Sequence, residues 1–133
     1  MGADYKKTHR SSIGGMTTAN VGANVTRYIF PFGGPVMVPE IDARMVMPFS
    51  CILTNFWVRS TLAPGVGETY DLTVLLNGAP TLLTLQIAGA VAVQAGPDLD
   101  IVAIVAGDEI DVEIVSSLNA ALCQMSWSIE CRH

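Results

Sequence analysis

Residues 69–88 read TYDLTVLLNGAPTLLTLQIA, and this stretch decides the fold. Asn77-Gly78 is the strongest short signal for a β-hairpin, because both residues tolerate the positive φ angles of a tight two-residue turn. From Leu83 to Ile87, apolar residues recur at every second position. A period of two is that of a strand with one buried face. We therefore predict a hairpin of two antiparallel strands, at 69–76 and 81–88.

The rest of the chain repeats this pattern of short runs and turns. No window has a convincing period of 3.6 residues, whereas residues 109–115 alternate strictly between apolar and acidic side chains. Eight or nine short strands at regular spacing predict an all-β antiparallel sandwich of the jelly-roll type. The further predicted strands are 25–32, 41–47, 51–60, 91–94, 99–105, 109–115 and 121–131.

The predicted strand 51–60 is apolar on both faces. A strand of this kind is covered on both sides. The opposite sheet is one cover, and a neighbouring subunit is a candidate for the other. Alternation places Ile52, Phe56 and Val58 on one face and Cys51, Leu53 and Trp57 on the other.

Composition limits the class of protein. The chain has 133 residues, enough for one domain, and is 50% hydrophobic but only 14% charged. Mean hydropathy is +0.44, which excludes a disordered chain. A net charge of -5 and a pI of about 4.7 argue against a basic nucleic-acid binder. The apolar surplus predicts association with other chains.

Leader and membrane segments are not expected. The first ten residues lack the apolar run of a signal peptide, and turn residues interrupt the uncharged stretch 72–97 too often for a membrane helix. The three cysteines, Cys51, Cys123 and Cys131, are expected to be reduced thiols, although Cys51 could pair with one of the others. Reduced thiols fit synthesis in a reducing cytoplasm.

The first 24 residues predict a flexible arm, followed by one domain at 25–133. The arm is rich in Gly, Ser, Thr and Asn, shows no periodicity, and carries Lys6, Lys7 and Arg10. Residues 1–59 have a net charge of +3, and residues 60–133 have -8. A basic arm on an acidic body is typical of an interaction tail. A solvated terminus that aids solubility explains the same residues equally well.

An enzyme is not predicted. The two histidines, His9 and His133, lie in the arm and at the last position, so no scaffold places them for nucleophilic catalysis or metal binding. Asp98 and Asp100 offer two oxygens to calcium, but their place beside Pro97 is explained by a turn. We predict no metal and no cofactor.

The densest acidic group offers the remaining enzyme chemistry, a carboxylate pair for glycoside hydrolysis. The outward face of a half-buried strand is an ordinary place for acids, and we expect them there in solvent. Trp57, Tyr70 and Trp127 could stack on a sugar, but aromatics at alternating positions more often belong to a core or an interface. The acidic group consists of Asp108, Glu109, Asp111 and Glu113.

The stretch from Val46 to Ile129 resembles the small jelly-roll modules found on phage and related virus particles, which are TNF-like and usually trimeric. It covers about two thirds of the chain and rests on turn and strand patterns, without a catalytic signature. These patterns are Met47-Pro48-Phe49, CILTNFWVR at 51–59, APGVGETYDLTVLLNG at 63–78, AGDEI at 106–110 and SWSIE at 126–130.

The resemblance implies a structural protein on the surface of a virion, made in the host cytoplasm. Such a homotrimer would decorate the capsid as a cement protein bound to the major capsid protein, with the basic arm contacting an acidic shell. The alternative is the receptor- or glycan-binding head of a phage fibre, with specificity in loops 62–68, 77–80 and 95–98. In either reading, the implied subunit interface contains Phe56, Trp57, Val58 and Trp127.

Overall fold

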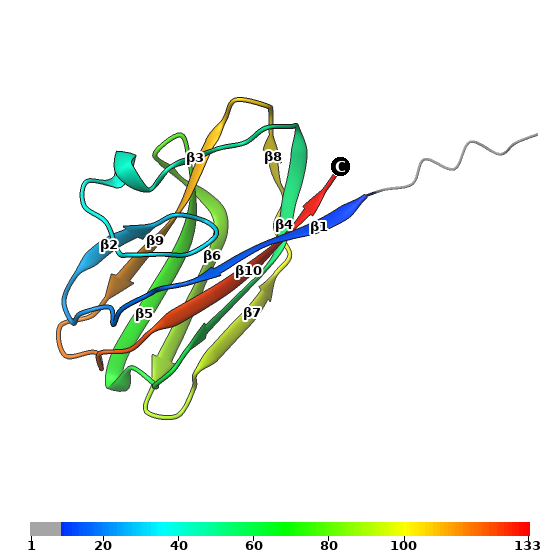
Figure 1. Cartoon of the computed structure of the whole chain (residues 1–133). Helices are drawn as coiled ribbons and strands as arrows, with labels where there is room; N and C mark the ends of the chain where they lie inside the picture. The colour runs from blue at the N-terminus through cyan, green and yellow to red at the C-terminus, as the bar shows by residue number, and fades with distance from the viewer. Residues whose placement is uncertain (1–8) are drawn as a thin grey trace, which may run out of the picture.

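The computed structural model describes residues 9–133 and confirms an all-β sandwich of two antiparallel sheets (Figure 1). Sheet I has the order β1-β10-β4-β7, with β8 also paired to β4. Sheet II has the order β2-β9-β5-β6, with β3 also paired to β9. Sheet I consists of β1 (Arg10–Met16), β10 (Met125–Arg132), β4 (Cys51–Ser60), β7 (Gln94–Asp98) and β8 (Val102–Ile104). Sheet II consists of β2 (Thr26–Ile29), β9 (Glu109–Ser116), β5 (Gly65–Leu76), β6 (Ala79–Gly89) and β3 (Met45–Val46).

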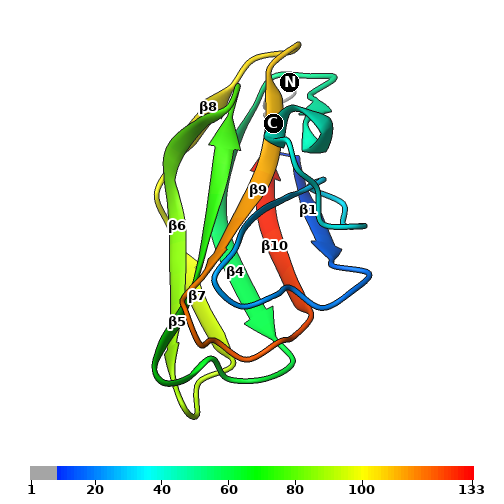
Figure 2. The ribbon, with the colours of Figure 1, turned by 90° about the vertical axis from the view of Figure 1, so that its left-hand side faces the viewer.

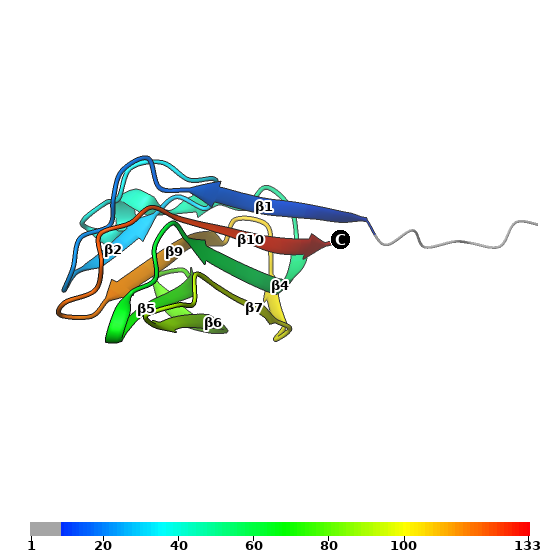
Figure 3. The ribbon, with the colours of Figure 1, turned by 90° about the horizontal axis from the view of Figure 1, so that it is seen from below.

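The chain passes back and forth between the two sheets, which lie face to face in Figure 2 and Figure 3. β1 and β10 are neighbours in sheet I, while β2 and β9 are neighbours in sheet II. Setting aside the short β3 and β8, the eight remaining strands have the order of a jelly roll. Within the described residues, no helix is long and apolar enough to cross a membrane.

The predicted hairpin is confirmed. Leu76 pairs with Ala79, so Asn77 and Gly78 form a two-residue turn with φ angles of 50° and 83°. The Asn77 side chain also ties the turn to β9, because its Oδ1 accepts a hydrogen bond of 2.9 Å from the backbone N–H of Glu109. This end of sheet II is therefore fixed by the residues that marked the turn in the sequence.

The core fills the space between the sheets with large apolar side chains, and two of them also anchor loops. The Tyr70 hydroxyl donates to the carbonyl of Ala121 at 2.6 Å, and the Trp127 indole N–H donates to the carbonyl of Pro31 at 2.8 Å. All three cysteines are buried free thiols, as expected. Burial, with Cys131 nearby, raises the pKa of the Cys51 thiol to about 12.

The prediction of a flexible arm through residue 24 is wrong from residue 10 onward. Residues 10–16 form β1, which pairs along its whole length with β10 and buries Ile13. Glycine is needed here, because a Cβ at Gly15 would collide with the backbone of Phe32 and Gly33. Small residues therefore allow β1 to lie close to the backbone of Phe32 and Gly33. A search for alternating apolar residues does not detect a strand of this kind. Lys6 and Lys7 lie outside the described residues.

The predicted strand 41–47 is also largely wrong. Residues Glu40–Ala43 form the short 3-10 helix η1, and only Met45–Val46 is a strand. Ala43 is fully buried, and η1 lies over the outer side of β9. The apolar residues of this stretch therefore belong to a connecting segment that packs on the outer side of sheet II.

Candidate interaction surfaces

The outer side of sheet I carries one half-buried aromatic residue, Trp57, among polar side chains. Two adjoining hollows of about 300 and 440 Å³ share Trp57 and Ser128. We call this surface the Trp57 face. Its residues are Arg10, Ser12, Asn55, Trp57, Arg59, Gln94, Ser126, Ser128, Glu130 and Arg132.

A β-bulge turns Trp57 outward. Thr54 pairs with Glu130 and Trp57 pairs with Ser128, so two residues of β4, Asn55 and Phe56, lie opposite a single residue of β10. Asn55 has a φ of 54°, a conformation that asparagine tolerates better than most residues. The extra residue reverses the alternation of β4, because a shift of one residue moves every later side chain to the other face.

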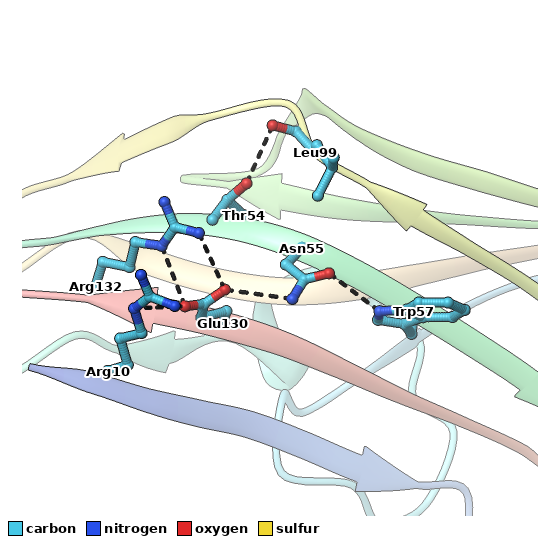
Figure 4. Close-up of polar contacts among 7 residues, drawn as sticks. All are labelled: Arg10, Thr54, Asn55, Trp57, Leu99, Glu130 and Arg132. Atoms are coloured by element: carbon cyan, nitrogen blue, oxygen red, sulfur yellow. Dashed lines mark hydrogen bonds and ion pairs between the residues drawn. The ribbon is translucent and has the colours of Figure 1, made fainter.

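A polar network runs from the Trp57 indole N–H to two arginines (Figure 4). The Asn55 amide accepts a hydrogen bond of 3.0 Å from the Trp57 indole N–H and donates one of 3.3 Å to Glu130. Arg132 donates to both carboxylate oxygens of Glu130, and Arg10 lies 3.4 Å from it. Arg132 foremost, and Asn55 and Arg10 after it, hold the pKa of Glu130 below its usual range. Glu130 is therefore paired within one chain, and the cluster of two arginines and one carboxylate keeps a net charge of +1.

Gly96 on β7 supports the ring of Trp57 from below. A Cβ at this position would lie 2.8 Å from Cε3 of Trp57 and 2.9 Å from the carbonyl oxygen of Phe56. Gly96 also has a φ of 130°, which side chains rarely adopt. The position of the ring therefore depends on a glycine of the neighbouring strand.

Asn55→Ala is expected to lower the free energy of unfolding by about 1–2 kcal/mol, because alanine is strained at positive φ. Asn55→Gly keeps the backbone angle, so it should cost less even though both variants lose the contacts with Trp57 and Glu130. Chemical denaturation of the two variants side by side measures the difference. Equal losses in both would contradict the role assigned to the backbone.

The end of the sandwich that is lowest in Figure 1 is mostly apolar, and we call it the loop end. It comprises residues 60–67, 90–93 and 117–124, which contain no Asp, Glu, Lys or Arg, although the carboxylate of the next residue, Glu68, accepts hydrogen bonds from Ser117 and Asn119. Backbone hydrogen bonds of 2.9 Å join these loops, from Ala121 to Pro64 and from Ser60 to Val93. Val66 and Val91 are 87% and 88% exposed. The other exposed large side chains of the loop end are Leu62, Leu118 and Leu122.

A third surface is an apolar groove between β1 and the residues that precede β4. It has a volume of about 360 Å³, and Phe32, Val46 and Phe49 are its exposed large side chains. The Phe49 ring packs against His133 with 4.6 Å between ring centroids. The last residue of the chain therefore lies beside the groove.

The predicted interface residues do not form one surface. Phe56 and Val58 are 0% and 1% exposed, and Trp127 is 4% exposed, so all three are buried in the core of the same chain. Only Trp57 reaches the surface. The bulge explains the error, because it places Phe56 and Val58 on the buried side and leaves Ile52 40% exposed on the other.

The three loops named for the fibre-head reading also do not gather. Residues 62–68 lie at the loop end, whereas the turn at 77–80 is at the far end of β5. Residues 95–98 belong to β7, inside sheet I. The sequence did not reveal that residues 90–93 and 117–124 lie beside residues 62–67 at one end of the sandwich. The absence of charge from all three segments was the available signal.

The acidic residues have different environments. Asp108 accepts hydrogen bonds from the backbone of Val105 and from the Asn77 side chain, which lower the pKa of its carboxyl. Asp111 is 0% exposed beneath η1, so the prediction that it faces solvent is wrong. Burial raises the pKa of Asp111 to about 8, and the nearby Glu40 adds to this effect. The covering segment was not predicted, which is why the burial was missed.

The Asp98 carboxylate stabilises the turn that follows β7 by accepting backbone hydrogen bonds. One oxygen accepts from the backbone of Thr84 at 3.1 Å and the other from the backbone of Asp100 at 3.0 Å. In the described part of the chain, no three His, Cys, Asp or Glu side chains lie together as a metal site. Of the aromatics considered for sugar stacking, Tyr70 and Trp127 are buried, and Trp57 alone is partly accessible.

Comparison with known proteins gives no family. The chain matches no family model, and no curated protein is detectably similar to it. Its function is therefore argued from its own surfaces.

Proposed function

We propose that this chain is a non-enzymatic structural protein of a virus particle, a homotrimer that decorates and stabilises the capsid. The observation that carries the proposal is the apolar surface left after folding. Between residues 9 and 133, sixteen large hydrophobic residues are at least 40% exposed. Five of them, Leu62, Val66, Val91, Leu118 and Leu122, belong to the loop end, and a grouped apolar surface of this kind marks an interaction site.

The Trp57 face is the proposed contact between subunits. It lies on the outer side of sheet I and combines one aromatic anchor with small serines. Its carboxylate, Glu130, is already paired with Arg10 and Arg132. With Arg10, Arg59 and Arg132 the face keeps a net positive charge, so the surface that it meets on the next subunit would have to offer acidic groups to avoid burying an unpaired charge. In a trimer, this face would contact a different surface of the next subunit, as in any closed ring.

The loop end is the proposed contact with the shell. Apart from the Glu68 carboxylate, which accepts hydrogen bonds from Ser117 and Asn119, this surface is apolar, so it fits an apolar patch on the major capsid protein. Lys6 and Lys7 precede β1, which begins at the end of sheet I opposite to the loop end, so their contacts with acidic groups of the shell would be made at a second point. In this arrangement the protein lies on the virion surface, and separate surfaces bind the neighbouring subunit and the shell.

Molar mass in solution tests the trimer. One chain has a mass of 14.1 kDa, so light scattering behind a sizing column should give about 42 kDa, unchanged by dilution. Trp57→Glu should reduce the mass to that of one chain. The matched control is Leu82→Glu, which places the same charge on an exposed residue of β6 in sheet II. A wild-type mass near 14 kDa would overturn the proposed trimer.

Co-sedimentation with capsids assembled without this protein tests the contact with the shell. Leu118→Ser with Leu122→Ser should reduce binding at least tenfold at any salt concentration, because the contact is apolar. Deletion of residues 1–8 should weaken binding mainly at low salt, since it removes the charges of Lys6 and Lys7. The deletion must stop before β1, whose loss would expose the edge of sheet I. Full binding by both variants would rule out this docking mode.

A glycan-binding fibre head is the second candidate, and the hollows beside Trp57 favour it. A partly accessible indole with Asn55, Arg59 and Gln94 around it offers a stacking surface and hydrogen-bonding groups to a sugar. The two functions exclude each other at this face, because a trimer would cover Trp57. Glycan-array binding by a monomer, lost in Trp57→Ala, would establish the second candidate and refute the first.

A further inference from the structure

A buried carboxylate beside a second carboxylate lies outside both proposed contact surfaces. Asp111 on β9 is 0% exposed, no N–H or hydroxyl group donates to either of its carboxylate oxygens, and the carboxylate of Glu40 is within hydrogen-bond reach. Buried polar groups are nearly always paired, so an exception needs a physical explanation. An ionised carboxylate in this position would carry a large desolvation cost, whereas a protonated one would not.

The segment that covers Asp111 is held weakly by its backbone. We call residues 38–44, which include η1, the strap. Its flanks are fixed, because Met37 exchanges two backbone hydrogen bonds with Tyr28 and Met45 pairs with Ile110. Among the described residues, the strap itself has one backbone hydrogen bond outside η1's own, from Asp42 to Pro39, and it is internal. The burial of Ala43 and side-chain contacts therefore keep the strap on β9.

The charged groups around Asp111 are mostly acidic. The strap contributes Glu40 and Arg44, which form an ion pair with contacts of 2.7 to 3.0 Å, and the more distant Asp42. β9 itself contributes Glu113 and Glu109, and β2 contributes Tyr28. The neighbours on the remaining sides, Leu75 on β5 and the turn at Asn77-Gly78, do not titrate in this range. Among residues 9–133, Arg44 is thus the one cation that faces several potential anions.

We propose that Asp111 is a proton-controlled latch, which holds the strap on β9 while it is protonated and releases it after losing its proton to water. The protonated carboxyl can donate to Glu40, which Arg44 keeps ionised by holding its pKa low. After ionisation, Asp111 faces the carboxylates of Glu40 and Glu113, and Arg44 can compensate only one of them. Repulsion and hydration then favour an open strap. The latch needs no partner, so it is independent of the proposed function.

Solution NMR of the full chain tests the latch between pH 3 and 10. The carboxyl carbon of Asp111 should titrate with a midpoint near the pKa of about 8, and strap amides should shift with the same midpoint. Their hydrogen exchange, corrected for the intrinsic effect of pH, should accelerate at least tenfold across the transition. Asp111→Asn should remove the step, because an amide stays neutral and can donate to Glu40.

The control is Asp100→Asn, which removes a carboxylate from the exposed connection between β7 and β8 and should leave the step unchanged. A titration midpoint of Asp111 near pH 4 would overturn the proposal. Strap amides whose chemical shifts and exchange rates do not change as Asp111 titrates would overturn it too. The wild-type titration alone decides these two points, so the test does not depend on the variant folding.

Discussion

Replacing Phe56 with alanine is expected to lower the free energy of unfolding by about 3–5 kcal/mol, the usual cost of removing a large core aromatic. Phe56 is 0% exposed between the sheets, on the strand that joins β10 to β7. β4 could not move to fill the cavity left behind without breaking its hydrogen bonds to both β10 and β7. Urea denaturation followed by tryptophan fluorescence, at one fixed protein concentration, measures the loss.

Trp57→Ala is the matched control, because it removes a larger aromatic side chain from the adjacent position. Trp57 lies on the outer side of sheet I, so its loss should cost less than half as much for the isolated chain. If sizing shows the two variants in the same oligomeric state, a larger cost for Trp57 than for Phe56 would contradict the assignment of Phe56 to the core and of Trp57 to the outer side.

Asp111→Asn is expected to stabilise the protein at pH 9 by several kcal/mol. Burial raises the pKa of Asp111 to about 8 in the folded chain, against an unfolded value of roughly 3.9. The folded state then binds the extra proton between these values, so the stability of the wild type is greatest below about pH 4. The stability falls as the pH rises, and this loss is complete above about pH 8. Asparagine cannot ionise and removes this decline.

Thermal or urea unfolding at pH 4.5 and pH 9 provides the comparison. The two proteins should differ little at pH 4.5, and the advantage of the variant should appear only as the pH rises. A variant that is less stable than the wild type at pH 9 would show that ionised Asp111 has a stabilising partner. That result would also contradict the absence of a hydrogen bond at both of its carboxylate oxygens.

Local patterns were enough to predict much of the fold. The strand at 51–60 and the turn at Asn77-Gly78 are where the sequence indicates, because turn chemistry and alternation act over a few residues. β1 was missed because it has a single large buried residue, Ile13, and is defined by pairing with β10 more than a hundred residues away. No property of residues 10–16 taken alone predicts that pairing.

The candidate sites were less predictable, because one residue can reverse a face. Alternation groups Phe56 and Val58 with Ile52, whereas the Asn55 bulge places both in the core and turns Trp57 outward. Asp111 follows an ideal amphipathic pattern on β9, yet a strap from a distant part of the chain covers it. In both cases the deciding interaction is tertiary, so periodicity within the strand could not reveal it.

The pairing of β1 with β10 has a consequence for synthesis of the chain. The partner of the first strand is the last one, and β2 likewise pairs with β9, which begins at Glu109. Neither sheet can therefore be completed on the ribosome before nearly the whole chain has emerged. Until then, the exposed hairpin of β5 and β6 is the largest unit that can form locally. We expect folding to be slow and dependent on protection from aggregation during that interval.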